Sequence, residues 1–197
     1  MASIINADTS DGLKISSDTS GIIELQSGGV TKMTVNSSGV SNSGKILQVL
    51  QTIKKDTFST TSNSYVPITG LNVSITPSAT SSKILVMANV SASGSAVNIP
   101  AHVTIRRGTT YILLGDPSGS RTRTAGTHCS VYGTERQLVP MSMSALDSPN
   151  TTSATTYHVN VLVAGSYTAY VNMTPFDYDN TGYGRACSQI TVMEIAG

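Results

Sequence analysis

Residues 12–44 read GLKISSDTSGIIELQSGGVTKMTVNSSGVSNSG, a series of short apolar-alternating segments separated by Gly, Ser, Asn and Asp. Gly12, Gly21 and Gly39 follow a spacing of nine residues, in which Val30 takes the remaining position. Each unit therefore reads as a strand of about four or five residues followed by a turn. Strands this short carry too few apolar side chains to enclose a core within one chain.

Repeats of this kind bury their apolar side chains against neighbouring units, which belong to the same chain or to other copies of it. We therefore predict that residues 1–44 form an N-terminal stem of short strands in which several copies of the chain intertwine. The side chains expected to pack in this stem are Leu13, Ile15, Ile23, Leu25, Met33 and Val35. The alternative interpretation is a flexible Ser/Gly linker, but the regular placement of these side chains favours the stem.

The segment that precedes the repeat, residues 1–11, has two apolar anchors, Ile4 and Ile5. They make it a candidate docking peptide for a larger particle, and a ragged tail is the alternative. The segment lacks the basic start and the long apolar stretch of a secretory signal, so we expect assembly in a cytoplasm. Cys129 and Cys187 are then expected to be free thiols, because that compartment disfavours disulfides and neither residue belongs to a CxxC motif.

The composition argues against several classes of partner. The chain has 197 residues, a formal net charge of +1 and only 12% charged residues. This balance gives no electrostatic reason to expect nucleic acid or a membrane surface as a partner. No run approaches the roughly 18 apolar residues of a membrane span. Ser and Thr make up more than a quarter of the chain, and we interpret this polar but weakly charged composition as that of durable β-structure.

From residue 45 onward the sequence predicts a second domain, residues 45–197, with about eight to ten strands and no clear helix. Residues 45–53 fit either a helix or a strand, and their Val, Ile and Thr content favours a strand. Pro67 lies within a strand pattern and therefore predicts an edge strand or a bulge. Residues 83–90 are apolar on both sides at first, which indicates a central strand.

Strands at this spacing predict an all-β chain whose second domain is an antiparallel sandwich of the jelly-roll type. Strand order cannot be read from the sequence. The inner faces of the two sheets are expected to carry Val73, Ile75, Leu85, Met87, Val103, Ile105, Val159, Val161, Val171 and Val192.

Two long stretches carry a family resemblance. Residues 45–92 read KILQVLQTIKKDTFSTTSNSYVPITGLNVSITPSATSSKILVMANVSA, and residues 8–40 read DTSDGLKISSDTSGIIELQSGGVTKMTVNSSGV. The first resembles the head domain, and the second the N-terminal repeats, of small tail-fibre-like virion proteins of aquatic tailed bacteriophages. Residues 146–159 and 189–197 are similar to the same family. The resemblance implies a homotrimer with a stem and a jelly-roll head on the surface of a virus particle, but its motifs identify no site.

The common catalytic motifs GxSxG, HExxH and GxxxxGK are absent from the sequence. Cys129 follows His128, but neighbours in a strand point to opposite faces and make a poor catalytic pair. We therefore expect no enzymatic activity, no cofactor and no resident metal. His102, His128 and His158 are expected on sheet surfaces, and the alternative is a three-histidine metal site on a threefold axis.

One loop is a candidate surface for a receptor or a neighbouring subunit. Asp177, Tyr178 and Asp179 begin a D-x-D-N-x-G sequence, and Tyr183 follows closely. The sequence is similar to a calcium loop but lacks the acidic residue at the twelfth position. A polar receptor-facing or inter-subunit loop is therefore favoured over a Ca²⁺ site.

Arg106, Arg107, Arg121 and Arg123 form the basic concentration of the sequence. Arg121 and Arg123 belong to the predicted loop 115–127 and are further candidates for a receptor or inter-subunit contact. The four side chains are interpreted either as a patch that meets an acidic capsid surface or glycan, or as solvated charges. The solvated interpretation is the simpler one.

Two functions are consistent with these observations. The first is a homotrimeric capsid decoration (cement) or head-fibre protein, whose N-terminal stem binds the major capsid protein or another virion protein. The alternative is a tail-associated fibre whose head binds a host-cell receptor or surface glycan. A glycan-processing tailspike enzyme is a third hypothesis. It is disfavoured because it needs paired carboxylates across a groove and the chain has only 11 Asp and Glu residues.

Overall fold

The computed structural model describes residues 20–37, 39–41, 44–129 and 136–197. In this part of the chain the named elements are all β-strands in antiparallel sheets, and no helix is long and apolar enough to cross a membrane. The chain divides into two compact units, Met1–Lys45 and Ile46–Gly197. We call them the N-terminal unit and the head domain.

The N-terminal unit contains a small antiparallel sheet in the order β1 (Ile23–Ser27), β2 (Val30–Asn36) and β3 (Gly39–Ser41). Gly28 and Gly29 form the turn between β1 and β2, with φ angles of 61° and 76°. Two-residue hairpin turns of this type need positive φ at both positions, which glycine adopts without steric cost. The predicted docking residues and two predicted stem residues lie outside the described residues, namely Ile4, Ile5, Leu13 and Ile15.

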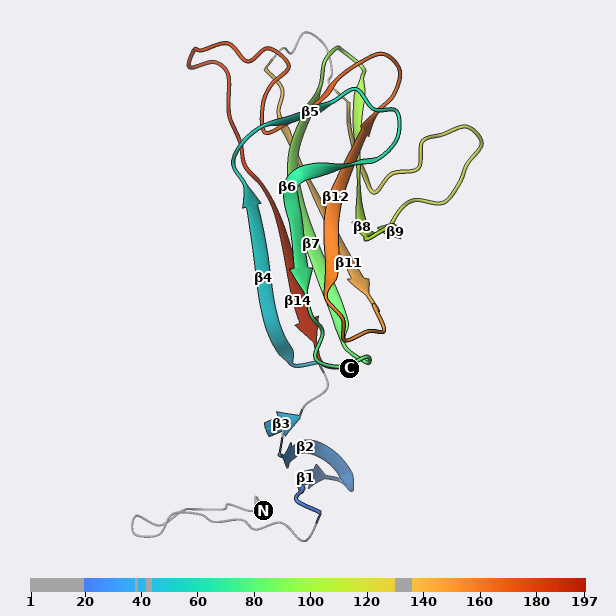
Figure 1. The fold of residues 1–197 in the computed structure, drawn as a ribbon, viewed down its shortest axis with the longest axis vertical. Helices are drawn as coiled ribbons and strands as arrows, with labels where there is room; N and C mark the ends of the chain where they lie inside the picture. Colours follow the sequence, from blue (N-terminus) through green and yellow to red (C-terminus); the bar gives the residue numbers. More distant parts are fainter. Residues whose placement is uncertain (1–19, 38, 42–43, 130–135) are drawn as a thin grey trace. The chain divides into compact units, whose positions relative to one another are not determined.

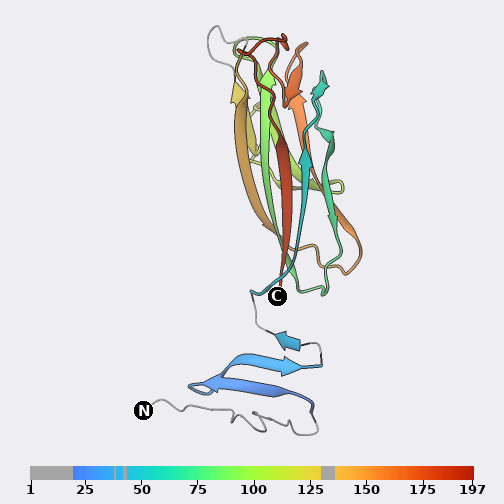
Figure 2. The same ribbon diagram turned by 90° about the vertical axis from the view of Figure 1, so that its left-hand side faces the viewer.

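The head domain contains two antiparallel sheets (Figures 1 and 2). The six-stranded sheet has the order β4 (Ile46–Lys54), β14 (Ser188–Ile195), β7 (Lys83–Gly94), β13 (Ala169–Val171) and β5 (Phe58–Thr60), and β11 (Val139–Asp147) also pairs with β7. The five-stranded sheet has the order β10 (Gly126–Cys129), β8 (Pro100–Arg107), β12 (Thr155–Val163) and β6 (Val66–Ile75), and β9 (Thr110–Leu113) also pairs with β8.

The two sheets form two layers (Figure 2), and strands of both layers contribute side chains to one hydrophobic core. The core is supplied mainly by alternate positions of the long strands, as expected when one face of each sheet is buried. In β7, for example, Ile84, Val86, Ala88 and Val90 are buried, whereas the intervening residues are more exposed. The head domain is therefore an antiparallel β-sandwich, while the jelly-roll topology stays a prediction.

Two local predictions for the head are confirmed. The ambiguous segment at residues 45–53 forms strand β4 rather than a helix. Strand β6, which contains Pro67, ends the path of the five-stranded sheet, and its pairing with β12 changes register between Pro67 and Asn72. Because proline cannot donate a ladder hydrogen bond, it is tolerated at such an edge and bulge.

The predicted core face of β7 is wrong. Leu85 and Met87 lie on the outer face and are only partly buried, whereas Ile84 and Val86 are 0% exposed. Strand β7 is apolar on both faces near its start, so the pattern there does not choose between them. The polar residue Asn89 identifies the outer face of β7, because its Nδ2 donates to Ser142 Oγ at 2.9 Å there. The other eight predicted inner-face residues are buried: Val73, Ile75, Val103, Ile105, Val159, Val161, Val171 and Val192.

Candidate interaction surfaces

The small sheet of the N-terminal unit has one apolar face. In the pairing of β1 with β2, Ile23 lies opposite Val35 and Leu25 lies opposite Met33. These are four of the predicted stem residues, and the alternation of strands places them on one side of the hairpin. None of them is buried, and Leu25 is 42% exposed. The structure therefore brings four predicted residues together on one face, where Leu25 is exposed and the other three are only partly buried.

The other face of the same hairpin is polar. Gln26 Nε2 donates to Glu24 Oε2 at 3.1 Å, and Thr31 Oγ1 donates to the same carboxylate oxygen at 3.1 Å. These exposed side chains need no cover, because they exchange hydrogen bonds with one another and with water. The small sheet thus has one apolar and one polar face, which is typical of a sheet that is buried on one side only.

Strand β4 forms the edge of the six-stranded sheet and exposes apolar side chains. Its five large hydrophobic residues are all more than one third exposed: Ile46 (53%), Leu47 (42%), Val49 (51%), Leu50 (37%) and Ile53 (47%). No charged residue stands between Ile46 and Ile53. Edge strands that remain in water are normally short or charged, since unpaired backbone groups beside apolar side chains favour association. Strand β4 is therefore a candidate association surface.

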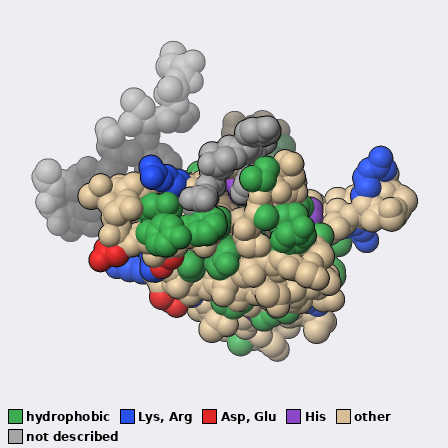
Figure 3. Space-filling view, turned by 90° about the horizontal axis from the view of Figure 1, so that it is seen from above, with side chains coloured by type: hydrophobic (Ala, Val, Ile, Leu, Met, Phe, Trp, Pro, Cys, Tyr) green, Lys and Arg blue, Asp and Glu red, His purple; other side chains and the backbone are tan. Residues whose placement is uncertain are grey.

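An aromatic loop cluster, consisting of Phe176, Tyr178, Tyr183 and Arg136, lies in and beside the loop that precedes β14. The Phe176 and Tyr178 rings are stacked with centroids 5.9 Å apart, and Tyr178 meets Tyr183 edge-to-face at 5.3 Å. The Arg136 guanidinium lies 5.1 Å from the centroid of the Tyr183 ring. Tyr178 is 58% exposed, and Figure 3 shows hydrophobic side chains gathered at this end of the head domain. Such a cluster can stack against a sugar ring or a partner's apolar side chain.

The calcium interpretation of this loop is not supported by its contacts. Both carboxylate oxygens of Asp177 accept hydrogen bonds from Arg185, one of them from Nε at 2.8 Å. A carboxylate that is engaged by a guanidinium fork has little capacity left for a cation. Asp179 is exposed, and no group of three or more possible metal ligands occurs among the described residues.

The four arginines of the basic concentration make separate contacts. Arg121 and Arg123 are exposed and bind their own loop, where Arg121 Nη1 donates to Ser118 Oγ at 2.9 Å and Arg123 Nε to Gly115 O at 2.6 Å. Arg106 lies 4.5 Å from the centroid of the Tyr111 ring. Arg107 instead pairs with Asp147, as described below. The four arginines are close in sequence, but their separate contacts show that they do not form one basic site.

The histidines also occupy different environments. His128 is buried, at 8% exposed, which makes the predicted surface position wrong for this residue. The reason is its register, because it lies opposite Ala101, a core residue of β8. His158 Nε2 is 3.1 Å from Gly108 O, and His102 is half-buried. Burial lowers the pKa of His102 and of His128.

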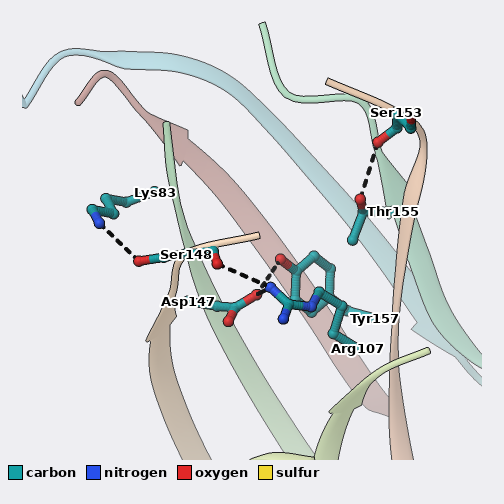
Figure 4. Close-up of polar contacts among 7 residues, drawn as sticks. All are labelled: Lys83, Arg107, Asp147, Ser148, Ser153, Thr155 and Tyr157. Carbon is teal, nitrogen blue, oxygen red and sulfur yellow. Dashed lines mark hydrogen bonds and ion pairs between the residues drawn. The ribbon is translucent and has the colours of Figure 1, made fainter. Parts of the chain in front are cut away.

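One partly buried polar cluster ties the two sheets together (Figure 4). Tyr157 Oη, from β12, donates to Asp147 Oδ2 at 2.7 Å. Arg107, from β8, donates through Nη1 to the same oxygen at 2.8 Å and to Ser148 O at 3.1 Å. Asp147 belongs to β11 of the six-stranded sheet, so its carboxylate bridges the sandwich. Burial, together with the hydrogen bond to Asp147, raises the pKa of Tyr157. These groups satisfy one another and serve the fold.

A buried carboxylate, that of Glu194, holds the turn between β6 and β7. Glu194 is 1% exposed, and its Oε1 accepts hydrogen bonds from Ser78 N at 2.7 Å and from Ser82 Oγ at 2.7 Å. Its Oε2 accepts a hydrogen bond from Gln48 Nε2 at 2.6 Å. Burial alone would raise the pKa of Glu194, but these donors outweigh it and lower the pKa to about 2. Glu194 is thus an ionised structural anchor.

Sequence reasoning missed several residues of these surfaces. The aromatic loop cluster depends on Arg136 and Phe176 as well as on the predicted Tyr178 and Tyr183. Phe176 adjoins the predicted loop and could have been found from it, but Arg136 is distant in sequence and gives no such signal. The exposure of β4 was also missed, because its apolar pattern is that of an ordinary core strand.

Comparisons with known proteins place no firm constraint on this chain. No protein-family model matches the sequence, and no curated protein is similar to it. Among solved structures, the VP2 subviral particle of infectious bursal disease virus is 13% identical, with a TM-score of 0.40, over 86% of this chain and 41% of that one. T=1 particles derived from infectious bursal virus are 11% identical, with a TM-score of 0.39, over 88% and 41%. This chain thus spans about two fifths of these viral particle proteins, and at this distance no conclusion rests on them.

Proposed function

We propose that this chain is a non-enzymatic structural protein of a virus particle, a homotrimer that decorates a phage capsid as a cement or head-fibre protein. The N-terminal unit forms the stem and docks on the major capsid protein or on another virion protein. The head domain is the part displayed at the virion surface. The trimeric state and the phage particle come from the resemblance of residues 8–40 and 45–92 to small phage virion proteins.

The observation that supports this proposal most directly is the partly exposed apolar face of the N-terminal unit. Ile23, Leu25, Met33 and Val35 share one side of a small sheet in which no described residue is buried. A sheet of this size does not bury enough apolar area to be stable alone. Association of three such faces around one axis covers all of them at once, and it leaves the polar face of Glu24 and Gln26 in water.

The experiment is a deletion of residues 1–44, compared with the full chain. We expect the full chain to have three times the mass of one copy in analytical ultracentrifugation and to bind particles that lack it. The truncated chain is expected to fold, as judged by its thermal unfolding, but not to join the particle. Particles that the truncated head decorates at full occupancy would contradict the assignment of the stem as the anchor.

The aromatic loop cluster favours a second candidate, a tail-associated fibre that binds a host receptor or surface glycan. Tyr178 is exposed and rests against Phe176 and Tyr183, a geometry suited to stacking on a sugar ring. Substituting Tyr178→Ala is then expected to abolish binding to host cells without changing assembly. Counting the copies per particle separates the two candidates, because decoration requires hundreds of copies and a tail carries only a few trimers.

A further inference from the structure

The outer face of the six-stranded sheet carries an ordered grid of side chains. We call the outer face the solvent side of β4, β14, β7 and β11, and its register gives three cross-strand rows. The first row is Val49, Met193, Leu85 and Leu146. The second row is Gln51, Thr191, Met87 and Ser144. The third row is Ile53, Gln189, Asn89 and Ser142.

These three rows contain no charged side chain. The first row is wholly apolar, and its two ends are well exposed, Val49 by 51% and Leu146 by 61%. Polar members of the other rows already bind one another: Gln51 Nε2 donates to Thr191 Oγ1 at 2.9 Å, and Asn89 Nδ2 donates to Ser142 Oγ at 2.9 Å. Covering the outer face would therefore bury no charged group and leave few hydrogen-bond donors without a partner, which keeps the desolvation cost low.

The outer face has both a projection and a hollow. Strand β4 projects Val49 and Ile53 at one margin of the sheet. Toward the other margin lies a shallow hollow of about 380 Å³, lined by Met87, Asn89, Ser142, Ser144, Gln189 and Thr191. The small serine side chains of β11 leave this space open beside the longer Met87. Apolar projections at one margin and an uncharged hollow near the other make the face complementary to itself.

We infer that the outer face is an interface between copies of this chain, in which the β4 margin of one copy packs into the hollow of the next. This inference rests on the proposed homotrimer and names the surface through which the heads meet. A head-to-tail contact of this kind closes into a ring when the rotation between copies is a third of a turn. The ring buries the unpaired edge of β4 and the exposed row of Val49 and Leu146 together.

A second copy is the occupant that the geometry favours. A charged partner would find no opposite charge on the three rows. A polar partner would gain little from contact with the exposed apolar side chains of Leu146 and Val49. The position of β4 gives an independent reason. It begins at Ile46, directly after the N-terminal unit ends at Lys45. If three N-terminal units associate, three copies of Ile46 are necessarily held near one another.

The test is a disulfide trap in the full chain, with Cys129→Ser and Cys187→Ser as background and Val49→Cys with Ser144→Cys added. The two new positions lie on strands that are three strand spacings apart in one sheet, about 14 Å. A disulfide requires Cα atoms within about 7 Å, so a bond between these positions must join two copies. We expect mild oxidation to convert most of the chain into covalent trimer.

The matched control is Asn72→Cys with Thr127→Cys in the same background. Both residues are exposed, and they lie on β6 and β10, three spacings apart in the five-stranded sheet. We expect no covalent trimer from this pair. If the chain has the mass of a trimer but the cysteines at positions 49 and 144 form no disulfide, the proposed interface is wrong and the proposed function still stands. A monomer by mass would overturn both, and covalent dimers alone would replace the ring with a two-fold contact.

Discussion

The N-terminal unit and the head domain solve the same physical problem in different ways. In the head, apolar residues on alternate strand positions meet across two sheets, and every buried hydrophobic residue of the described chain belongs to it. In the N-terminal unit the same alternation occurs, but no described residue is buried. Ile23 and Val35 are paired across a hairpin, and both remain partly exposed.

The difference shows that an alternating pattern determines which residues share an apolar face, but not which other element packs against that face. The head has enough strands to fold its own faces together, whereas three short strands do not. The head should therefore respond to core substitutions as an independent domain, and the N-terminal unit should respond only through association. The following predictions test this comparison, from the largest expected effect on the stability of the head to the smallest.

The largest effect is expected from Val86→Asp. Val86 is 0% exposed in the core, and a buried unpaired carboxylate costs at least about 4 kcal/mol, so we expect no soluble head domain. The matched control is Leu85→Asp, one residue away on the outer face, which is expected to give folded protein. Expression and thermal unfolding measure both variants. Soluble, folded Val86→Asp protein would show that the core face of β7 is misassigned.

Acidification is expected to act through Glu194. Its pKa in the folded head is about 2, below the ordinary value of 4.5. The stabilisation is therefore fully present above pH 4.5 and is lost as the pH falls toward 2. Between pH 7 and pH 3 this group should account for a loss of about 2 kcal/mol in the free energy of unfolding. Denaturant unfolding at both values measures it.

The control for this pH dependence is Glu194→Gln, which keeps the shape of the side chain without its charge. It should be less stable than the wild type at pH 7 and should lose most of the difference at pH 3. An equal destabilisation of the variant at both pH values would exclude Glu194 as the source of the pH dependence.

A smaller effect is expected from Tyr157→Phe. The substitution removes the hydrogen bond between Tyr157 Oη and Asp147 but leaves the Asp147 carboxylate paired with Arg107. We expect the free energy of unfolding to fall by about 1–2 kcal/mol, measured from the denaturant midpoint. No change at all would mean that this link between the two sheets contributes nothing to stability.

The smallest effect on the head is expected from the N-terminal unit. Leu25→Lys places a charge on its apolar face, and Gln26→Lys places the same charge on the polar face beside Glu24. Neither should change the unfolding of the head by more than about 0.5 kcal/mol. Sedimentation at several concentrations should show association weakened at least about tenfold by Leu25→Lys alone. Equal effects of the two variants would contradict the assignment of the apolar face as the surface through which copies associate.

Much of this protein was determined by its sequence. Alternation and turn residues predicted an all-β chain, strand β4 in place of a helix, and an edge strand or a bulge at Pro67. They also predicted the apolar set from Ile23 to Val35, which the pairing of β1 with β2 places on one face. These features are local, since they depend on a side-chain period of two and on the backbone limits of proline and glycine.

Only the tertiary structure decided which faces are covered. Leu85 and Ile84 are equally apolar, yet one lies outside and the other in the core, because the position of β12 and its sheet selects the inner side. Val49 and Ile53 have the pattern of core residues but lie exposed on an edge strand. Arg136 reaches Tyr183 from a distant part of the chain. Burial and long-range contact depend on how elements are placed in space, and a pattern along one strand carries no information about its neighbours.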